Sequence, residues 1–180
     1  MYGMIHKAAR EYCEGRIGKD AWDRLMLRCD LDREHFISGK HYDDETTMRL
    51  LSEIRDTLGC EMDQLLFEFG HYWISFTQAS SYAAAMKMLG DDMPTFMRNL
   101  DSLHQSVQST MPEASLPSFV VIGESQTTIE LLYRSNRDGL ETFVKGLLTG
   151  LMDRFGESGD ISSRYSGSDL IFTIERKLAA

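Results

Sequence analysis

Two stretches of this sequence carry residues that could hold a cofactor, and the first surrounds His104 in "NLDSLHQSVQ". His104 follows Leu100 by four residues and precedes Val107 by three, so on a helix it lies on or beside the apolar stripe. A neutral imidazole in that place needs a partner for each ring nitrogen. The sequence leaves two interpretations open: a core histidine bonded to a backbone carbonyl, or an axial ligand of haem iron.

The second stretch, "YRSNR", places Tyr133, Ser135 and Arg137 at alternate positions. Side chains alternate along an extended segment, so these three are expected to share one face while Arg134 and Asn136 face away. Two hydroxyls and a guanidinium on one face can bind an anion with several oxygens, because the planar guanidinium forms two parallel hydrogen bonds with a carboxylate. The same pattern is also typical of the exposed polar face of an amphipathic strand.

The elements that must position these residues change from helices to strands near residue 112. Before it, apolar residues three and four apart predict helices, the last of them over residues 91–111. After it, "SFVVIGE" and "TTIELLYR" predict a hairpin around "GESQ", "DGLETFVKGLLTGLMDRFG" predicts a helix, and "ISSRYSGSDLIFTIER" predicts two further strands. We therefore expect one α+β domain over residues 1–180, with a helical subdomain at about 1–111 and an antiparallel four-stranded sheet with a long helix at about 112–180.

Local signals indicate where several helices begin and end. Asp20 is expected to cap the second helix, Gly59 to end the third, and Pro94 to lie in the first turn of the helix at 91–111. Two prolines bracket residues 112–117, which makes this loop the expected hinge between the two subdomains.

Composition argues against several classes of function. The chain has 180 residues, of which 42% are hydrophobic and 26% charged, and its formal net charge of −9 argues against nucleic acid as a partner. No apolar stretch reaches the roughly 20 residues of a membrane span, and the N-terminus lacks the apolar core of a signal peptide. Cys13, Cys29 and Cys60 are odd in number and far apart, which argues against disulfides and a zinc site. We therefore expect a protein of the reducing cytoplasm.

Taken together, the helix-borne histidine, the following proline, the hairpin and the Tyr-x-Ser-x-Arg stretch resemble the haem-nitric oxide/oxygen binding (H-NOX) family, whose sensor domain also occurs in soluble guanylate cyclases. The motifs "MYG", "EFGHYW", "NLDSLH", "LPSF" and "GLLTGL" extend this resemblance over essentially the whole chain. The resemblance implies that haem b (iron protoporphyrin IX) is buried between the helical and the sheet-containing subdomains.

The resemblance also implies roles for individual residues. His104 matches the proximal ligand of the haem iron, and Tyr133, Ser135 and Arg137 match the residues that bind the haem propionates. Two further residues, Pro117 in "LPSF" and Ile5 in the first helix, match positions that press on the porphyrin from its two sides. Without the resemblance, the proline is a loop breaker and the isoleucine an ordinary core residue.

The choice of gas depends on the distal side of the haem. In oxygen-binding members of the family a tyrosine on the helix after Tyr-x-Ser-x-Arg donates a hydrogen bond to oxygen, and here Thr142 matches that position. No tyrosine occurs in residues 138–156, and Phe143 and Leu147 make the same helix apolar. We therefore expect a sensor of nitric oxide and carbon monoxide. Trp73 matches a second distal position and has an indole N–H that can donate, so an oxygen-binding sensor is the alternative.

The resemblance implies a sensor without catalytic activity that signals to a separate protein. In bacterial members that partner is a histidine kinase, a cyclic-di-GMP enzyme or a chemotaxis receptor. A haem peroxidase is one rival, with His71 as a distal acid–base group, but His71 and Trp73 are two residues apart and should point to different sides of a helix. The other rival is a haem-free helical interaction module in which a cysteine acts as a thiol sensor, although free cysteines are more often small core residues.

Overall fold

The computed structural model describes residues 1–29, 31 and 36–177, in which six helices precede the first strand. They are α1 (Gly3–Ile17), α2 (Lys19–Arg28), α3 (Asp44–Leu58), α4 (Met62–Ala79), α5 (Ala83–Met88) and α6 (Met93–Thr110). The sheet-containing part consists of β1 (Ser118–Glu124), β2 (Thr128–Arg134), α7 (Glu141–Arg154), β3 (Ser158–Ser166) and β4 (Asp169–Lys177). The predicted α+β class and the change from helices to strands are confirmed.

The four strands form one antiparallel sheet in the order β1-β2-β4-β3. The predicted loop "GESQ" is shorter in the structure, because Gly123 and Glu124 continue β1 after a bulge that begins at Val121. Gly167 has a φ of 63° in the turn between β3 and β4, a conformation that glycine adopts without strain. No helix in the described part of the chain has the length and apolar character needed to cross a membrane.

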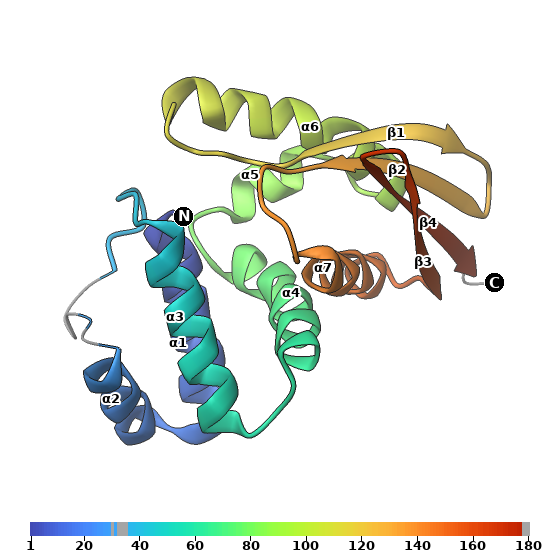
Figure 1. The fold of residues 1–180 in the computed structure, drawn as a ribbon. Helices are drawn as coiled ribbons and strands as arrows, with labels where there is room; N and C mark the ends of the chain where they lie inside the picture. The colour runs from blue at the N-terminus through green and yellow to red at the C-terminus, as the bar shows by residue number, and fades with distance from the viewer. Residues whose placement is uncertain (30, 32–35, 178–180) are drawn as a thin grey trace.

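The apolar core has two parts, and they do not divide at residue 112. Residues of α1 to α4 form the first core, around Trp22, Leu50 and Leu65. The second core lies between α5, α6, α7 and the sheet, around Phe96 and Phe172. By packing, α6 therefore belongs with the sheet, because its apolar stripe covers β1. Figure 1 shows this arrangement: α1, α2 and α3 lie together at the left, the sheet lies at the upper right, and α4 and α7 lie between them.

Glycines bring α4 and α7 into close contact. A Cβ atom built on Gly146 of α7 would lie 2.0 Å from the carbonyl oxygen of Phe67, and one built on Gly70 of α4 would lie 2.2 Å from the carbonyl oxygen of Phe143. Only glycine permits helix backbones to approach this closely. The motif "GLLTGL" therefore serves the junction between the two cores.

The helix ends follow the sequence signals with one exception. Gly59 ends α3 in the left-handed conformation, and Pro94 lies in the first turn of α6, as predicted. The prediction for Asp20 is wrong, because α2 begins directly after Gly18, whose φ of 80° reverses the chain, and Asp20 lies inside the first turn. The short α5 was not predicted, because its 6 residues are too few to show a helical period.

Candidate functional site

The helix α6 places His104 on a face that the protein covers only in part. Its first half is fixed by buried Phe96 and Met97 and by Asp92, whose side chain accepts a hydrogen bond from the backbone N–H of Thr95 at 2.8 Å. In its second half the same apolar stripe is only half-buried at Leu103, as is His104 itself. The second half of α6 thus offers an apolar, partly covered surface around an imidazole.

His104 has a defined tautomer. Its Nδ1 lies 2.7 Å from the carbonyl oxygen of Pro117, and because a carbonyl only accepts, Nδ1 carries the hydrogen and Nε2 keeps a lone pair. Burial lowers the pKa of His104 below its ordinary value of 6.5, although the Pro117 carbonyl and the charge of Asp101 oppose this shift. The ring is therefore neutral near pH 7. A core histidine and a haem ligand both use a backbone carbonyl for one nitrogen, but only the ligand uses the other to bind metal.

A residue that the sequence analysis missed, Asp101, helps to hold this geometry. Its Oδ1 accepts hydrogen bonds from the Ser118 hydroxyl at 2.7 Å and from the backbone N–H of Phe119 at 3.2 Å. His104 binds the carbonyl of Pro117, the residue before Ser118. One face of α6 therefore binds three consecutive residues at the start of β1. The signal was present in "NLDSLH", where Asp101 lies three residues before the histidine and so on the same side of the helix.

Tyr133, Ser135 and Arg137 lie close together, as predicted. Tyr133 is buried at the end of β2, with its ring centroid 5.1 Å from that of Phe119. Burial raises its pKa, whereas a hydrogen bond with Ser135 and the charge of Arg137 oppose the shift. The Ser135 hydroxyl also accepts a hydrogen bond from the backbone N–H of Arg137 at 3.0 Å. Tyr133, Ser135 and Arg137 therefore form one cluster at the end of β2, in which Ser135 is joined to Arg137 through the backbone N–H of Arg137.

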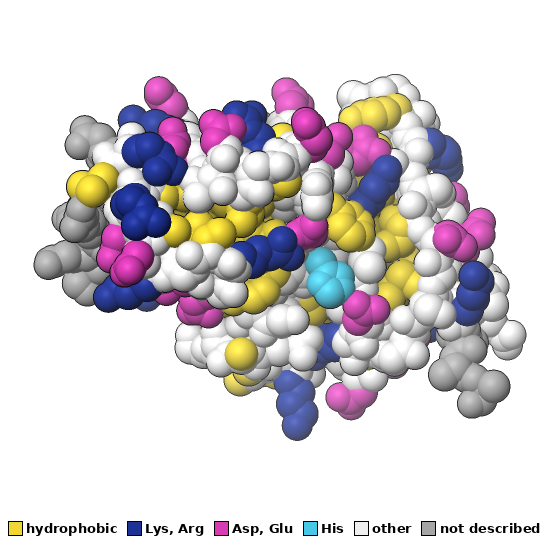
Figure 2. Space-filling view, turned by 90° about the horizontal axis from the view of Figure 1, so that it is seen from below, with side chains coloured by type: hydrophobic (Ala, Val, Ile, Leu, Met, Phe, Trp, Pro, Cys, Tyr) yellow, Lys and Arg dark blue, Asp and Glu magenta, His cyan; other side chains and the backbone are white. Residues whose placement is uncertain are grey.

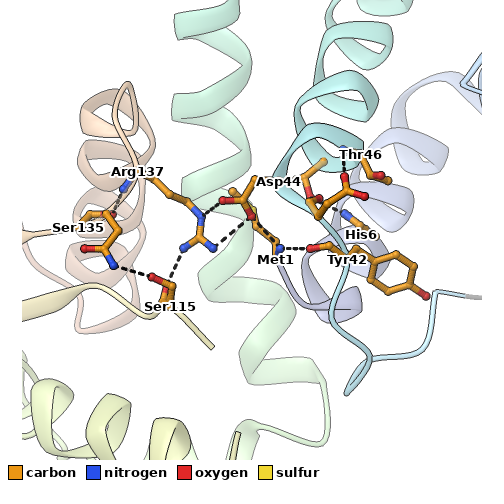
Figure 3. Close-up of polar contacts among 11 residues, drawn as sticks. Met1, His6, Tyr42, Asp44, Thr46, Ser115, Ser135 and Arg137 are labelled. Atoms are coloured by element: carbon orange, nitrogen blue, oxygen red, sulfur yellow. Dashed lines mark hydrogen bonds and ion pairs between the residues drawn. The ribbon is translucent and has the colours of Figure 1, made fainter. Parts of the chain in front are cut away.

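The guanidinium of Arg137 already binds a carboxylate in this structure. Its Nε and one terminal nitrogen donate to Asp44 at 2.7 and 3.2 Å, and its other terminal nitrogen donates to the Ser115 carbonyl at 2.5 Å. The amino group of Met1 donates to the same Asp44 carboxylate at 2.8 Å (Figure 3). Hydrogen bonds from Arg137 and Met1 lower the pKa of Asp44 to about 2. Arg137 thus has the geometry that carboxylate recognition requires, and a haem propionate would share it with Asp44 or displace Asp44.

The predicted alternation in "YRSNR" is confirmed at one position and wrong at another. Arg134 faces away from the cluster and pairs with Asp169 at 2.9 Å. Asn136 does not face away, because its amide donates to the Ser115 hydroxyl at 3.1 Å, beside Arg137. The reason is that β2 ends at Arg134, after which the chain no longer alternates.

The predicted distal residues lie at the junction of the two cores. Trp73 packs against both cores, Leu147 against the sheet core, and Ile5 and Phe143 against the core of α1 to α4. The Thr142 hydroxyl lies 3.5 Å from a carboxylate oxygen of Asp63 at the start of α4. The predicted distal residues therefore provide apolar side chains and the indole of Trp73, whereas the Thr142 hydroxyl contacts α4.

The groups that the rival interpretations need are placed elsewhere. His71 points away from Trp73, as predicted, and its Nε2 lies 2.7 Å from Asp153 on the half-exposed surface of α4 and α7. Cys13 and Cys29 are buried, and burial raises the pKa of both thiols, that of Cys13 to about 11. A thiol sensor needs an accessible thiolate, which these two residues do not provide. Cys60 is only half-buried, so this alternative depends on Cys60 alone.

These observations fit a haem group. The proximal side has a neutral imidazole with a lone pair directed from a partly covered apolar helix, which is what haem iron binds. A guanidinium and two hydroxyls lie where the chain leaves β2, and carboxylates are their natural ligands. An α+β domain that carries these two groups has the residues that a haem-binding domain needs.

The comparisons with known proteins identify the family. Residues 2–163 match the family described as Haem-NO-binding, so the chain belongs to this family. It is 29% identical over 152 residues to the soluble guanylate cyclase gcy-35 of Caenorhabditis elegans, a match that covers 82% of this chain and 22% of that protein. It is 32% identical over 94 residues to the guanylate cyclase soluble subunit beta-2 of Rattus norvegicus, covering 52% of this chain and 14% of that subunit. The chain thus matches a small part of each relative's length.

Solved structures share the fold. The H-NOX protein from S. oneidensis in its Fe(II)NO state superposes with a TM-score of 0.85 at 21% identity, covering 99% of this chain and 100% of that one. An oxygen-binding H-NOX domain in its oxygen complex also gives a TM-score of 0.85, at 18% identity, with 99% of this chain and 96% of that chain covered. Because the two structures hold different gases on one fold, the fold by itself does not decide which gas binds.

Proposed function

We propose that this chain is a haem-based sensor domain for nitric oxide and carbon monoxide, with haem b held by His104. The observation that carries the proposal is the hydrogen bond from His104 Nδ1 to the Pro117 carbonyl, which leaves a neutral Nε2 free to ligate iron. Ferrous haem, when bound, supplies the iron at which a diatomic gas binds. Tyr133, Ser135 and Arg137 bind the propionates, and Pro117 and Ile5 contact the porphyrin.

The preference for nitric oxide over oxygen is supported by the distal residues. Bound oxygen gains from a hydrogen-bond donor, and the helix α7 has no tyrosine. The hydroxyl of Thr142 is directed to Asp63, and Phe143 and Leu147 are apolar. Nitric oxide and carbon monoxide depend less on such a donor, so this distal side favours them.

An oxygen sensor is the second candidate, and Trp73 favours it. Trp73 packs against the sheet core as Leu147 does, and its indole N–H can donate a hydrogen bond. The two candidates differ in the role of this one side chain: a donor in the oxygen sensor, and a bulky filler in the nitric oxide sensor.

Signalling is proposed to pass to a separate protein such as a histidine kinase, a cyclic-di-GMP enzyme or a chemotaxis receptor. The domain itself contributes no reaction in this proposal. The support is the family: in the guanylate cyclase relative gcy-35 the matched segment is 22% of the protein, which favours a domain that passes its signal to a partner outside the matched segment.

The first test concerns the ligand. We expect His104→Ala to abolish stable haem incorporation, or to leave haem held only by its propionates, and we expect added imidazole to restore the axial ligand. The visible spectrum of the reduced protein reports both outcomes. His71→Ala is the matched control and should keep the wild-type spectrum. An unchanged spectrum in the His104 variant would show that His104 is not the ligand.

The second test concerns the gas. Reduced protein should show a new spectrum with nitric oxide and with carbon monoxide, and no oxygen-complex spectrum in air. A stable oxygen complex would contradict the proposed selectivity. Trp73→Phe should then abolish that complex and leave nitric oxide binding intact.

A further inference from the structure

Two adjoining hollows lie on the face formed by α1, α4, α7 and the start of β3. The first has a volume of 530 Å³ and lies between α1 and α4, with Tyr12 and Tyr72 among its lining residues. The second has a volume of 310 Å³ and extends from α7 to β3, with Met152 and Ile161 among its lining residues. Phe67 and one threonine line both hollows, which makes them one continuous groove. None of the residues assigned to the haem lines this groove.

The groove has an apolar floor that is accessible from outside. Phe67 lies where the two hollows meet and is 36% exposed, a large fraction for an aromatic residue on a packed helix. Figure 2 shows the molecule from below, with hydrophobic side chains visible in hollows that charged side chains surround. The floor is also firmly held, because Gly146 and Gly150 keep α7 in close contact with α4. A rigid groove with an exposed aromatic residue at its centre is typical of a protein-binding site.

The rim of the groove is acidic. Five of its lining residues are carboxylates and two are cations: Glu11, Glu68, Asp153, Glu157 and Asp160, against Arg16 and Lys145. Two of the carboxylates are neutralised, because Glu68 pairs with Arg16 at 2.6 Å and the nearly buried Glu157 pairs with Arg176 at 2.5 Å. Lys145 is also paired, with Glu141 at 3.0 Å. The exposed charge of the rim therefore comes from Glu11, Asp153 and Asp160, the last of which lies 3.8 Å from Lys177. The complement to this surface is a partner with apolar side chains along its centre and basic side chains at its margins.

The groove walls favour a helix over an extended peptide. They consist mostly of α1, α4 and α7, whose backbone groups are already paired within each helix. Over these helices an extended peptide would leave its own N–H and carbonyl groups without partners, at a cost in free energy. Only the start of β3, which is an edge strand of the sheet, could pair with such a peptide, and it lines one end of the groove. A helix satisfies its own backbone and presents side chains at positions i, i+3, i+4 and i+7, which can enter two adjoining hollows.

We propose that this groove is a docking site for a basic amphipathic helix of the signalling partner. The inference rests on the proposed function in so far as a sensor needs a partner, and it adds the place and the chemistry of the contact. Apolar side chains of the helix enter the hollows on either side of Phe67, and its lysines and arginines face the carboxylates of the rim.

The test uses the haem-loaded protein and a synthetic peptide as the probe. The peptide has leucine at helix positions i, i+3, i+4 and i+7 and lysine at the flanking positions, and its counterpart has glutamate in place of lysine. Fluorescence anisotropy measures affinity, and amide chemical shifts of the labelled protein locate the site. We expect the basic peptide to bind, to shift resonances of α1, α4 and α7, and to bind more weakly in high salt, whereas the acidic peptide should not bind.

Variants of the protein test which side chains contact the peptide. Phe67→Ala is expected to weaken binding of the basic peptide at least about thirtyfold, the effect of removing an interface hot spot. The double change Asp153→Lys and Asp160→Lys should weaken it further. Met88→Ala and Asp56→Lys are the matched controls, because both side chains are exposed on other elements and neither lines the groove.

The haem spectrum separates this inference from the proposed function. All four variants should keep the wild-type spectrum with and without nitric oxide, since none touches the haem residues. Three results would each overturn the docking site. The basic peptide could bind wild type and the groove variants equally well, the acidic peptide could bind as well as the basic one, or the chemical-shift changes could be confined to the sheet. A protein that fails to bind haem but still binds the peptide would overturn the sensor proposal alone.

Discussion

For individual residues, the hydrogen-bond partner determines what each buried imidazole can do. His104 gives its Nδ1 hydrogen to a carbonyl and keeps Nε2 for a ligand. His6, in α1, is fully buried, and its Nε2 lies 2.7 Å from the Thr47 hydroxyl while its Nδ1 has no hydrogen-bond partner among the described residues. Burial and the charge of the Met1 amino group lower the pKa of His6 to about 4. His6 is therefore a neutral structural group of the helical core.

This assignment predicts a pH dependence of stability. The unfolded chain takes up a proton at His6 near pH 6.5, whereas the folded protein does so only at about pH 4. The contribution of His6 to the free energy of unfolding is complete above pH 6.5. It is lost as the pH falls towards 4, by up to roughly 3 kcal/mol. Denaturant unfolding of His6→Gln should show a weaker loss between these pH values than wild type. The exposed His41, changed to Gln, is the control, and equal losses in wild type and the His6 variant would contradict the assignment.

The proposed binding of the propionates by Tyr133, Ser135 and Arg137 predicts a ranking of two variants. Arg137→Ala should lose haem to an acceptor protein faster than Ser135→Ala does. The reason is that a charge-assisted bidentate contact contributes roughly 1.5–3 kcal/mol and a neutral hydroxyl about 0.5–1.5 kcal/mol. Equal and negligible effects on the rate of haem loss would remove this cluster from the site.

The sequence predicted the local part of the site but not its long-range contacts. His104 and the Tyr133–Arg137 stretch are visible because each depends on spacing within one element. Asp44 was not predicted, because it lies 93 residues before Arg137 and only the folded chain brings them together. Asp101 also escaped notice, although its position relative to His104 was visible, because nothing in the sequence shows that it would bind the start of β1.

At the scale of elements, the predictions succeeded where an apolar stripe is buried on one side. The helix at 91–111 and β2, in which buried residues alternate with half-buried ones, are such cases. The division of the chain into subdomains depends instead on which faces meet, and the grouping of α6 with the sheet core is a property of packing. Periodicity identifies a face but does not show what covers it.

The contact between α4 and α7 predicts the effect of adding one methyl group. Gly146→Ala should destabilise the protein by about 1–3 kcal/mol, because the new Cβ would meet the Phe67 carbonyl and the helices must separate. Gly15→Ala is the matched control, since Gly15 also lies within a helix but has no atoms within 4 Å of its Cβ position. There alanine should stabilise the helix by about 0.5–1 kcal/mol. Thermal unfolding distinguishes the two, and a stabilised Gly146 variant would contradict the close packing.

The connection between α6 and β1 predicts a role for Asp101 in positioning His104. Asp101→Ala removes two hydrogen-bond acceptor contacts to Ser118 and Phe119, so it should speed haem loss and alter the visible spectrum of the reduced protein. Asp101→Asn keeps an acceptor oxygen and should restore much of the wild-type behaviour. Gln105→Ala is the control, because it removes only the contact of Gln105 with the other Asp101 oxygen. A spectrum unchanged in Asp101→Ala would limit this residue to a structural role.

At the scale of the whole molecule, the candidate site spans the two cores. His104, Pro117 and Tyr133 belong to the sheet side, whereas Ile5 and Phe143 pack against the core of α1 to α4. Besides the α4–α7 contact, the cluster of Arg137, Asp44 and the Met1 amino group ties the segment after β2 to the beginning of α3 (Figure 3). In the proposed site, Arg137 would bind a haem propionate as well as Asp44, so a change at the haem would act on the relative position of the two cores.

In this proposal Arg137 binds both Asp44 and a haem propionate. A change at Asp44 should therefore separate its role in joining the two cores from its role in haem binding. Asp44→Asn removes the carboxylate charge that holds Arg137 and Met1, so amide hydrogen exchange in α1 and α3 should become faster. The same change leaves the guanidinium free for a propionate, so haem loss should be no faster than in wild type. Arg137→Ala should instead speed both exchange and haem loss, and Glu45→Gln, one residue along on the exposed side of α3, should change neither. Because the pKa of Asp44 is lowered to about 2, its own contribution to slow exchange should persist until the pH falls towards that value, below the range in which His6 takes up a proton. The difference in exchange between wild type and Asp44→Asn should therefore remain at pH 4. Faster haem loss in Asp44→Asn would show that Asp44 supports haem binding and does not compete with the propionate for Arg137.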